Sequence, residues 1–197
     1  MLLWYVALLF IAFILGYFDV SVLVSFLVVS AYIVLTFPLA MPLFWSKNTN
    51  RMMNYLKKSH NAYYRFLYRF LNGEQEEAEK IVGDMRKGKI KNLAKVMLLI
   101  KQEHYSEARK LLETIRNGSF KDYYLAAAAH GEGKIEDYHT YKDKVKDADF
   151  KKWLEIEELV HAGRKAEARE LLDEQIGRLR GVKLLSAVHY RQEMENR

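Results

Sequence analysis

A seven-residue stretch that recurs at a fixed interval constrains this chain more than any other feature. It first occurs as Asn72 to Ala78, and later copies at 102–108, 132–138 and 162–168 give a period of 30. Glycine stands at the second position in three copies (73, 133 and 163), and alanine ends three copies (78, 108 and 168). A fixed period of this length indicates a solenoid, in which similar units stack side by side.

Apolar residues recur with the same period and predict two helices in each unit. One such column holds Tyr63, Leu93, Tyr123 and Trp153. Within a unit, apolar residues fall at helical spacing, as at Phe150, Trp153, Ile156 and Val160. We therefore expect an all-α fold in which residues 60–180 form about four helix pairs.

Residues 1–46 differ sharply from the repeats because Asp19 is their only charged side chain. Apolar runs on either side of Asp19 predict two transmembrane helices, at about 2–18 and 20–45, with a short turn near Asp19. A carboxylate is costly inside a bilayer, so the turn is expected at the water surface. A signal peptide is the alternative, but the apolar stretch is longer than a signal peptide has and no basic residue begins it.

Positive charges follow the apolar region directly and predict its orientation. Residues 47–59 form a basic linker, and no acidic residue occurs between Asp19 and Glu74. The positive-inside rule then predicts a multi-pass protein of the cell membrane with both termini in the cytoplasm. The same charges could contact the membrane surface, or they could serve only as the topology signal; the candidates for surface contact are Lys47, Arg51, Lys57 and Lys58.

The turns of two repeats carry a family resemblance. Residues 101–108 (Lys-Gln-Glu-His-Tyr-Ser-Glu-Ala) and 162–168 (Ala-Gly-Arg-Lys-Ala-Glu-Ala) resemble the turn and second-helix start of tetratricopeptide (TPR) repeats. The resemblance implies a TPR-like α-solenoid that serves protein–protein interaction. The units here are shorter than those of that family, in which a repeat usually has about 34 residues. No proline closes the units either, so no binding position of that family is transferred. The layout is also similar to the HemY-type N-terminal region.

Residues 181–197 are expected to form a capping helix, because the last unit of a solenoid needs a cover for its apolar face. Val182, Leu185 and Val188 recur at helical spacing there, and the tail beyond them is polar.

The third repeat departs from its siblings and offers two interpretations. It has Tyr138 where the other copies have alanine, and His130 where they have Phe70, Ile100 and Val160. In the first interpretation, the small residues of 126–129 make room for the larger tyrosine, because cores conserve total volume better than identity. In the second, a partner-binding pocket is formed by Tyr123, Tyr124, His130 and Tyr138.

Another candidate surface is a basic stripe at the second repeat. Lys87, Lys91 and Lys95 are four residues apart and would share one face of a helix. Such a stripe could meet an acidic protein or an anionic lipid, although a solvated face has the same pattern. Nucleic acid is not the expected partner, because the chain has no nucleic-acid-binding motif.

The residue types that support catalysis form no recognisable set. The chain has no cysteine, its six histidines show no metal-ligand spacing, and no phosphate loop or nucleophile elbow occurs. We therefore predict no enzyme, no cofactor and no catalytic or metal site.

The function expected from the sequence is that of a membrane-anchored cytoplasmic scaffold or adaptor, which binds a protein partner through its helical surface. The alternative is a lipid-facing or membrane-complex assembly factor, in which the basic segments engage anionic lipid.

Overall fold

The computed structural model describes the backbone of residues 2–196 and the side chains of residues 4–37 and 41–195. This part of the chain is helical without any strand, which confirms the all-α class. The helices are α1 (Leu2–Tyr17), α2 (Val22–Ala40), α3 (Pro42–Trp45), α4 (Thr49–Lys57), α5 (Ala62–Leu71), α6 (Gln75–Asp84), α7 (Lys89–Lys101), α8 (Tyr105–Glu113), α9 (Ser119–Gly131), α10 (Ile135–Lys144), α11 (Ala148–His161), α12 (Lys165–Arg178) and α13 (Gly181–Asn196).

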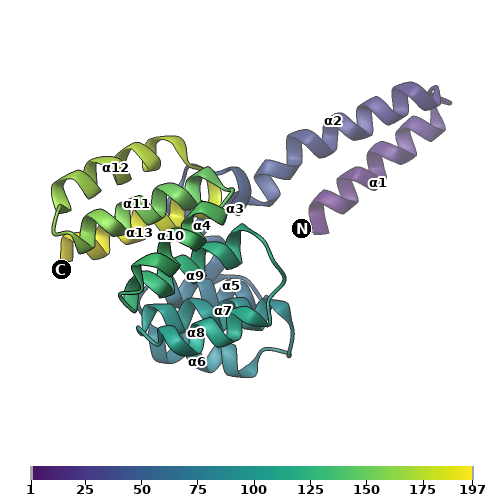
Figure 1. Ribbon diagram of the computed structural model, residues 1–197. Helices are drawn as coiled ribbons and strands as arrows, with labels where there is room; N and C mark the ends of the chain where they lie inside the picture. Colours follow the sequence, from purple (N-terminus) through teal and green to yellow (C-terminus); the bar gives the residue numbers. More distant parts are fainter. Residues whose placement is uncertain (1, 197) are drawn as a thin grey trace.

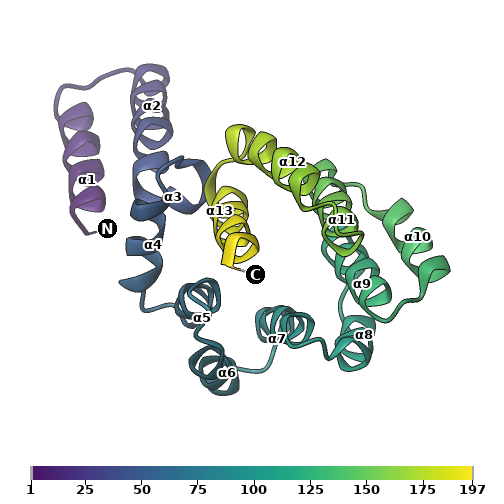
Figure 2. The same cartoon turned by 90° about the vertical axis from the view of Figure 1, so that its left-hand side faces the viewer.

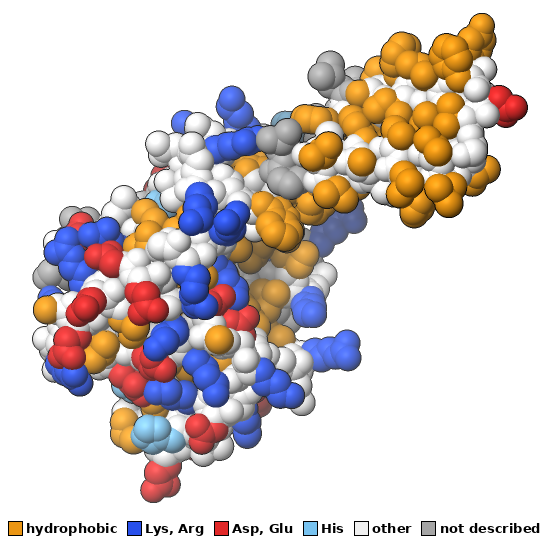
Figure 3. All heavy atoms as spheres, turned by 90° about the horizontal axis from the view of Figure 1, so that it is seen from above, with side chains coloured by type: hydrophobic (Ala, Val, Ile, Leu, Met, Phe, Trp, Pro, Cys, Tyr) orange, Lys and Arg blue, Asp and Glu red, His pale blue; other side chains and the backbone are white. Residues whose placement is uncertain are grey.

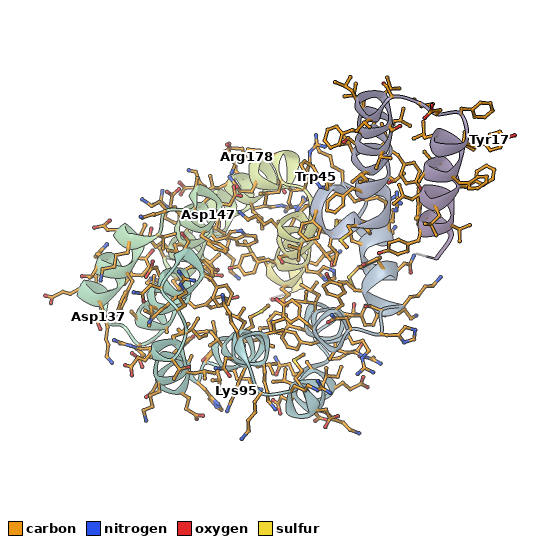
Figure 4. All side chains as sticks on the ribbon, turned by 90° about the vertical axis from the view of Figure 1, so that its right-hand side faces the viewer. Tyr17, Trp45, Lys95, Asp137, Asp147 and Arg178 are labelled. Carbon is orange, nitrogen blue, oxygen red and sulfur yellow. The ribbon has the colours of Figure 1, made fainter. Side chains whose placement is uncertain are left out.

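Helices α1 and α2 form a hairpin that projects from the other helices (Figure 1). The chain reverses at Asp19, whose backbone φ is 49°. The Tyr32 hydroxyl of α2 donates a hydrogen bond of 3.0 Å to the Trp4 carbonyl of α1 and joins the two helices. Hydrophobic side chains cover much of the hairpin surface (Figure 3), and Tyr17 points away from the molecule (Figure 4).

The prediction of two transmembrane helices is wrong, because no helix in the described residues is long and apolar enough to cross a membrane. The same finding overturns the assignment to the cell membrane as a multi-pass protein with two cytoplasmic termini. Helix α1 has 16 residues, or about 24 Å at about 1.5 Å per residue, whereas a hydrocarbon core is about 30 Å thick. The helix predicted over 20–45 is divided at Met41, since Pro42 begins α3.

The turns inside the helix pairs share one backbone geometry, which recurs at the equivalent position of every repeat. Gly73, Glu103, Gly133 and Gly163 have φ of 75°, 61°, 70° and 75°. The next residue in each turn donates its backbone N–H to a carbonyl five residues earlier, at 3.0 Å for Glu74, 2.8 Å for His104, 2.9 Å for Lys134 and 2.8 Å for Arg164. These left-handed residues end α5, α7, α9 and α11 and set the direction of the helices that follow.

The residue that ends each seven-residue stretch is buried between helices. Ala78, Ala108 and Ala168 are fully buried, and Tyr138 is 2% exposed. Tyr138 shares its buried cluster with Ala126 and Ala129, which agrees with the interpretation that small residues of α9 make room for the larger ring.

Helix α13 does more than cover the last repeat. It packs on α12 as a cap would, but it also contacts α3 and α4. Figure 2 shows α13 inside a ring of helices, with α6, α8 and α10 on the outside. The Tyr190 ring of α13 lies 5.5 Å from the Trp153 ring of α11, and Glu193 pairs with Lys101 of α7 at 2.5 Å. Helix α13 therefore fills the inner side of the array and joins its two ends.

Candidate protein-binding cleft

A cleft of about 610 Å³ lies where α4, α5 and α6 meet. We call it the basic cleft. Its lining residues come from the end of α4, the middle and end of α5, and the middle of α6. They are Leu56, Lys57, Arg65, Tyr68, Arg69, Glu77, Lys80 and Ile81.

The cleft is built from consecutive helices whose starts are fixed by side-chain caps. The Asn48 side chain accepts a hydrogen bond of 2.9 Å from the Arg51 backbone N–H at the start of α4. Asn61 accepts a bond of 2.9 Å from the Tyr63 backbone N–H at the start of α5. Asparagine is among the best residues at this position, because its oxygen satisfies a backbone donor that the helix leaves free. The left-handed turn at Gly73 then places α6 beside α5.

Apolar and aromatic groups lie among the charges of the basic cleft. Leu56 is completely buried, and Ile81 and Tyr68 are half-buried. The Arg69 guanidinium lies 5.7 Å from the centre of the Tyr68 ring, within the range of a cation–π contact. Tyr68 and Ile81 therefore offer a surface on which an apolar side chain can pack, whereas Leu56 closes the cleft from behind.

Most of the charge in the basic cleft is positive and has no partner. Lys57, Arg65 and Lys80 are exposed, and within the described part of the chain none of them has an ion pair or a side-chain hydrogen bond. Arg69 is paired with Glu74 and, at 2.9 Å, with Glu77, which is the one acidic residue of the lining. The hydrogen bond from Arg69 to Glu74 raises the pKa of Arg69 above its usual value.

The four basic residues expected at a membrane surface have different surroundings. Lys47 donates a hydrogen bond of 3.1 Å to the Gly177 carbonyl, so it joins the segment before α4 to α12. Arg51 stands in the first turn of α4, and Lys58 follows the end of that helix and is exposed. Of the four, Lys57 alone lines the basic cleft.

The predicted lysine stripe does not form along one helix face. Lys87 precedes α7, which begins at Lys89. Lys91 donates hydrogen bonds of 2.7 Å to the Gly83 carbonyl and 3.0 Å to the Met85 carbonyl, so it holds the end of the preceding helix. Lys95 is exposed and points away from the array (Figure 4).

Two of the residues predicted for the partner-binding pocket, Tyr123 and Tyr124, pack against other aromatic rings, one in the same repeat and one in the next. Tyr123 stacks on Phe150 with ring centres 4.8 Å apart, and Tyr124 lies 4.5 Å from the Phe120 ring. Burial raises the pKa of both tyrosines. Neither ring lines the basic cleft: Tyr123 packs in the buried cluster that reaches α11, and Tyr124 packs in the cluster of α7, α8 and α9.

The other two residues of that predicted pocket, His130 and Tyr138, lie with ring centres 4.8 Å apart in a polar cluster between α9, α10 and α11. The His161 ring is 4.7 Å from His130, and Lys142 pairs with Glu158 at 2.8 Å. Burial, and then the neighbouring His161, lowers the pKa of His130. Burial raises the pKa of Tyr138, and the Glu158 carboxylate adds to the shift.

The sequence did not single out Tyr68 and Lys80 as cleft residues. Arg65 and Arg69 lie in the stretch between Asp19 and Glu74 that has no acidic residue, but that pattern does not mark them as cleft residues. Lys80 has a counterpart in Lys110 at the same position of the next repeat, as Arg65 has in Lys95. The repeat position alone does not distinguish the members of these pairs, because the cleft depends on α4, which the later repeats do not have beside them.

Within the described residues, no group of three or more His, Asp or Glu side chains could hold a metal ion. The chain matches no family model, no curated protein and no solved structure. The TPR resemblance and the HemY-like layout therefore stay predictions, and the candidate site rests on the geometry of the cleft.

Proposed function

We propose that this protein is a helical scaffold that binds another protein at the basic cleft. The observation that carries the proposal is the set of unpaired cations, Lys57, Arg65 and Lys80, which line the same cleft as the half-buried Tyr68 and Ile81. A partner segment that carries carboxylates on either side of an apolar side chain would match both features of the cleft.

The size of the cleft and the position of α13 support a protein partner. A volume of about 610 Å³ lies within the range of roughly 300 to 1,000 Å³ of ligand sites and can take more than one side chain. The inner side of the array is filled by α13. The basic cleft, in contrast, is not filled by any other part of the chain that the structure describes, so a partner can enter it.

The exposure of the cations determines how such binding would behave. Exposed charge pairs contribute little free energy each, about 0 to 1 kcal/mol, but complementary charge accelerates association. We expect affinity in the micromolar range or weaker, and we expect it to fall as salt is added, because the Debye length shortens to about 8 Å at physiological ionic strength.

A binding experiment with a defined probe tests this proposal. The probe is a short fluorescent peptide of glutamates around a central phenylalanine, and its binding to the full chain is followed by fluorescence anisotropy. The double variant Arg65→Glu with Lys80→Glu should weaken binding at least tenfold. The matched control, Lys95→Glu with Lys110→Glu, makes the same charge change at the same positions of the next repeat and should reduce binding less than threefold.

Two results would contradict the proposal. The first is equal loss of binding in the two double variants, since that would indicate a general charge effect. The second is no binding of the peptide together with salt-sensitive binding of the full chain to anionic vesicles, which would favour the lipid-facing alternative.

A further inference from the structure

One wall of the basic cleft is supported from behind by the C-terminal helix. Leu56 lines the cleft and is completely buried. It belongs to the same buried cluster as Leu184 and Leu185 of α13, which are 4% and 0% exposed. Helix α4 thus contacts α13 and contributes Leu56 and Lys57 to the lining of the cleft.

The beginning of α13 is fixed to the segment just before α4 by a close backbone contact. The Gly181 N–H donates a hydrogen bond of 2.9 Å to the Ser46 carbonyl. Gly181 has a φ of 60°, and a Cβ atom there would lie 2.2 Å from the Leu43 carbonyl oxygen. Only glycine combines this conformation with this approach.

The rest of α13 is held by the buried Leu184, Leu185 and Ala187, and ion pairs at partly exposed side chains add to this packing. Lys183 pairs with Asp149 at 2.7 Å, and Arg191 lies 3.1 Å from Asp173. Pairs with this exposure are individually weak. Helix α4 itself has nine residues, and isolated helices shorter than about 12 residues are marginal in water. Its place therefore depends on packing against its neighbours, and α13 is one of them.

We propose that α13 is a latch for the basic cleft. When α13 is docked, α4 is held in place and Leu56 and Lys57 complete the cleft. When the contact at Gly181 is broken, α4 loses its support and the cleft loses that wall. The consequence for binding rests on the proposed function, whereas the dependence of α4 on α13 does not.

The substitution Gly181→Ala in the full chain tests the latch, with Gly177→Ala as the matched control. A Cβ at Gly177 would meet no atom within 4 Å. Hydrogen exchange reports on α4 and α13, and the glutamate–phenylalanine peptide reports on the cleft. We expect Gly181→Ala to speed exchange at least tenfold in both helices and to weaken peptide binding at least tenfold, while Gly177→Ala changes either quantity less than threefold.

The two readouts separate the latch from the proposed function. Faster exchange in α13 with unchanged exchange in α4 would overturn the latch. If the wild-type chain does not bind the peptide, the proposed function fails. Hydrogen exchange in α4 of the Gly181→Ala variant still decides whether α13 supports α4. If Gly181→Ala unfolds the whole chain, Lys183→Met removes the ion pairs at the start of α13 and is measured in the same way. If Lys183→Met speeds exchange in α13 while exchange in α4 is unchanged, the latch is again overturned.

Discussion

Glu103 has a left-handed backbone conformation, and the equivalent residue in each of the other three repeats is a glycine. Its φ is 61°, close to the 70° to 75° of Gly73, Gly133 and Gly163. A residue with a Cβ atom costs roughly 1 to 2 kcal/mol in this region. The Glu103 side chain is exposed and has no ion pair within the described residues, so no contact of that kind offsets the cost.

The substitution Glu103→Gly is therefore expected to stabilise the protein, by about 0.5 to 1 kcal/mol, because the strain is removed while the unfolded chain gains some freedom. Urea unfolding measures the change. The opposite kind of change at the equivalent position of the fourth repeat, Gly163→Ala, should lower the free energy of unfolding by about 1 kcal/mol. A Cβ atom there has space, but the positive φ is unfavourable for alanine. A loss of stability in Glu103→Gly would show that its side chain makes a contribution larger than the strain.

His130 is expected to make stability depend on pH. Its pKa in the folded state is lowered from 6.5, first by burial and then by His161, while Lys142 and His139 act in the same direction and Glu158 opposes them. The unfolded chain therefore binds more protons as the pH falls below about 6.5, and the folded state loses stability there.

The variant His130→Val, which copies Val160 of the next repeat, should show a smaller loss of stability between about pH 7 and pH 5 than the wild type. Urea midpoints at the two pH values measure this difference. His189, whose pKa burial also lowers, keeps part of the dependence in both proteins. An unchanged difference between the two pH values would contradict the role of His130.

At the scale of helices, a lysine in the first turn of one helix pair holds the end of the preceding pair. Lys91 donates to the carbonyls of Gly83 and Met85 at the end of α6, and Lys121, its counterpart in the next repeat, donates to the Ile115 carbonyl at 3.2 Å. The last carbonyls of a helix have no partner within it, and a positive charge near them is favourable. These lysines therefore fix the angle between successive pairs.

Replacing Lys91 with methionine should lower the free energy of unfolding by about 0.5 to 1.5 kcal/mol, because two carbonyls lose their donor. The control Lys95→Met changes an exposed lysine of the same helix and should have little effect. Binding of the glutamate–phenylalanine peptide should stay unchanged in Lys91→Met. Equal stability of the two variants would contradict the capping role.

For the whole molecule, the repeating helix pairs were predictable because turn chemistry is local. The turns at Gly73, Gly133 and Gly163 need residues that adopt positive φ, and the sequence displays them. The double role of α13 was not predictable. The apolar pattern that includes Leu184 and Leu185 is the same whether the helix covers the last repeat alone or packs on both ends of the array.

The basic cleft was not predictable for a related reason. Its residues come from three helices, and only packing decides which lysines meet. Lys57 was noted for its place in a basic segment, whereas Lys80 has a lysine, Lys110, at the matching position of the next repeat. The membrane prediction rested on apolar composition, which does not fix where a helix ends: α1 has 16 residues, and Pro42 begins a separate helix after α2.

Site-specific photo-cross-linking in living cells tests the central claim most directly. A photoreactive amino acid replaces Lys80 in the full chain, and in a second variant it replaces Lys110 at the matching position of the next repeat. We predict that the variant at position 80 forms a protein adduct, that the cross-linked peptide of the partner is acidic around an apolar residue, and that the variant at 110 forms little of it. Equal adducts at the two positions, or none at position 80, would contradict a protein-binding role for the basic cleft.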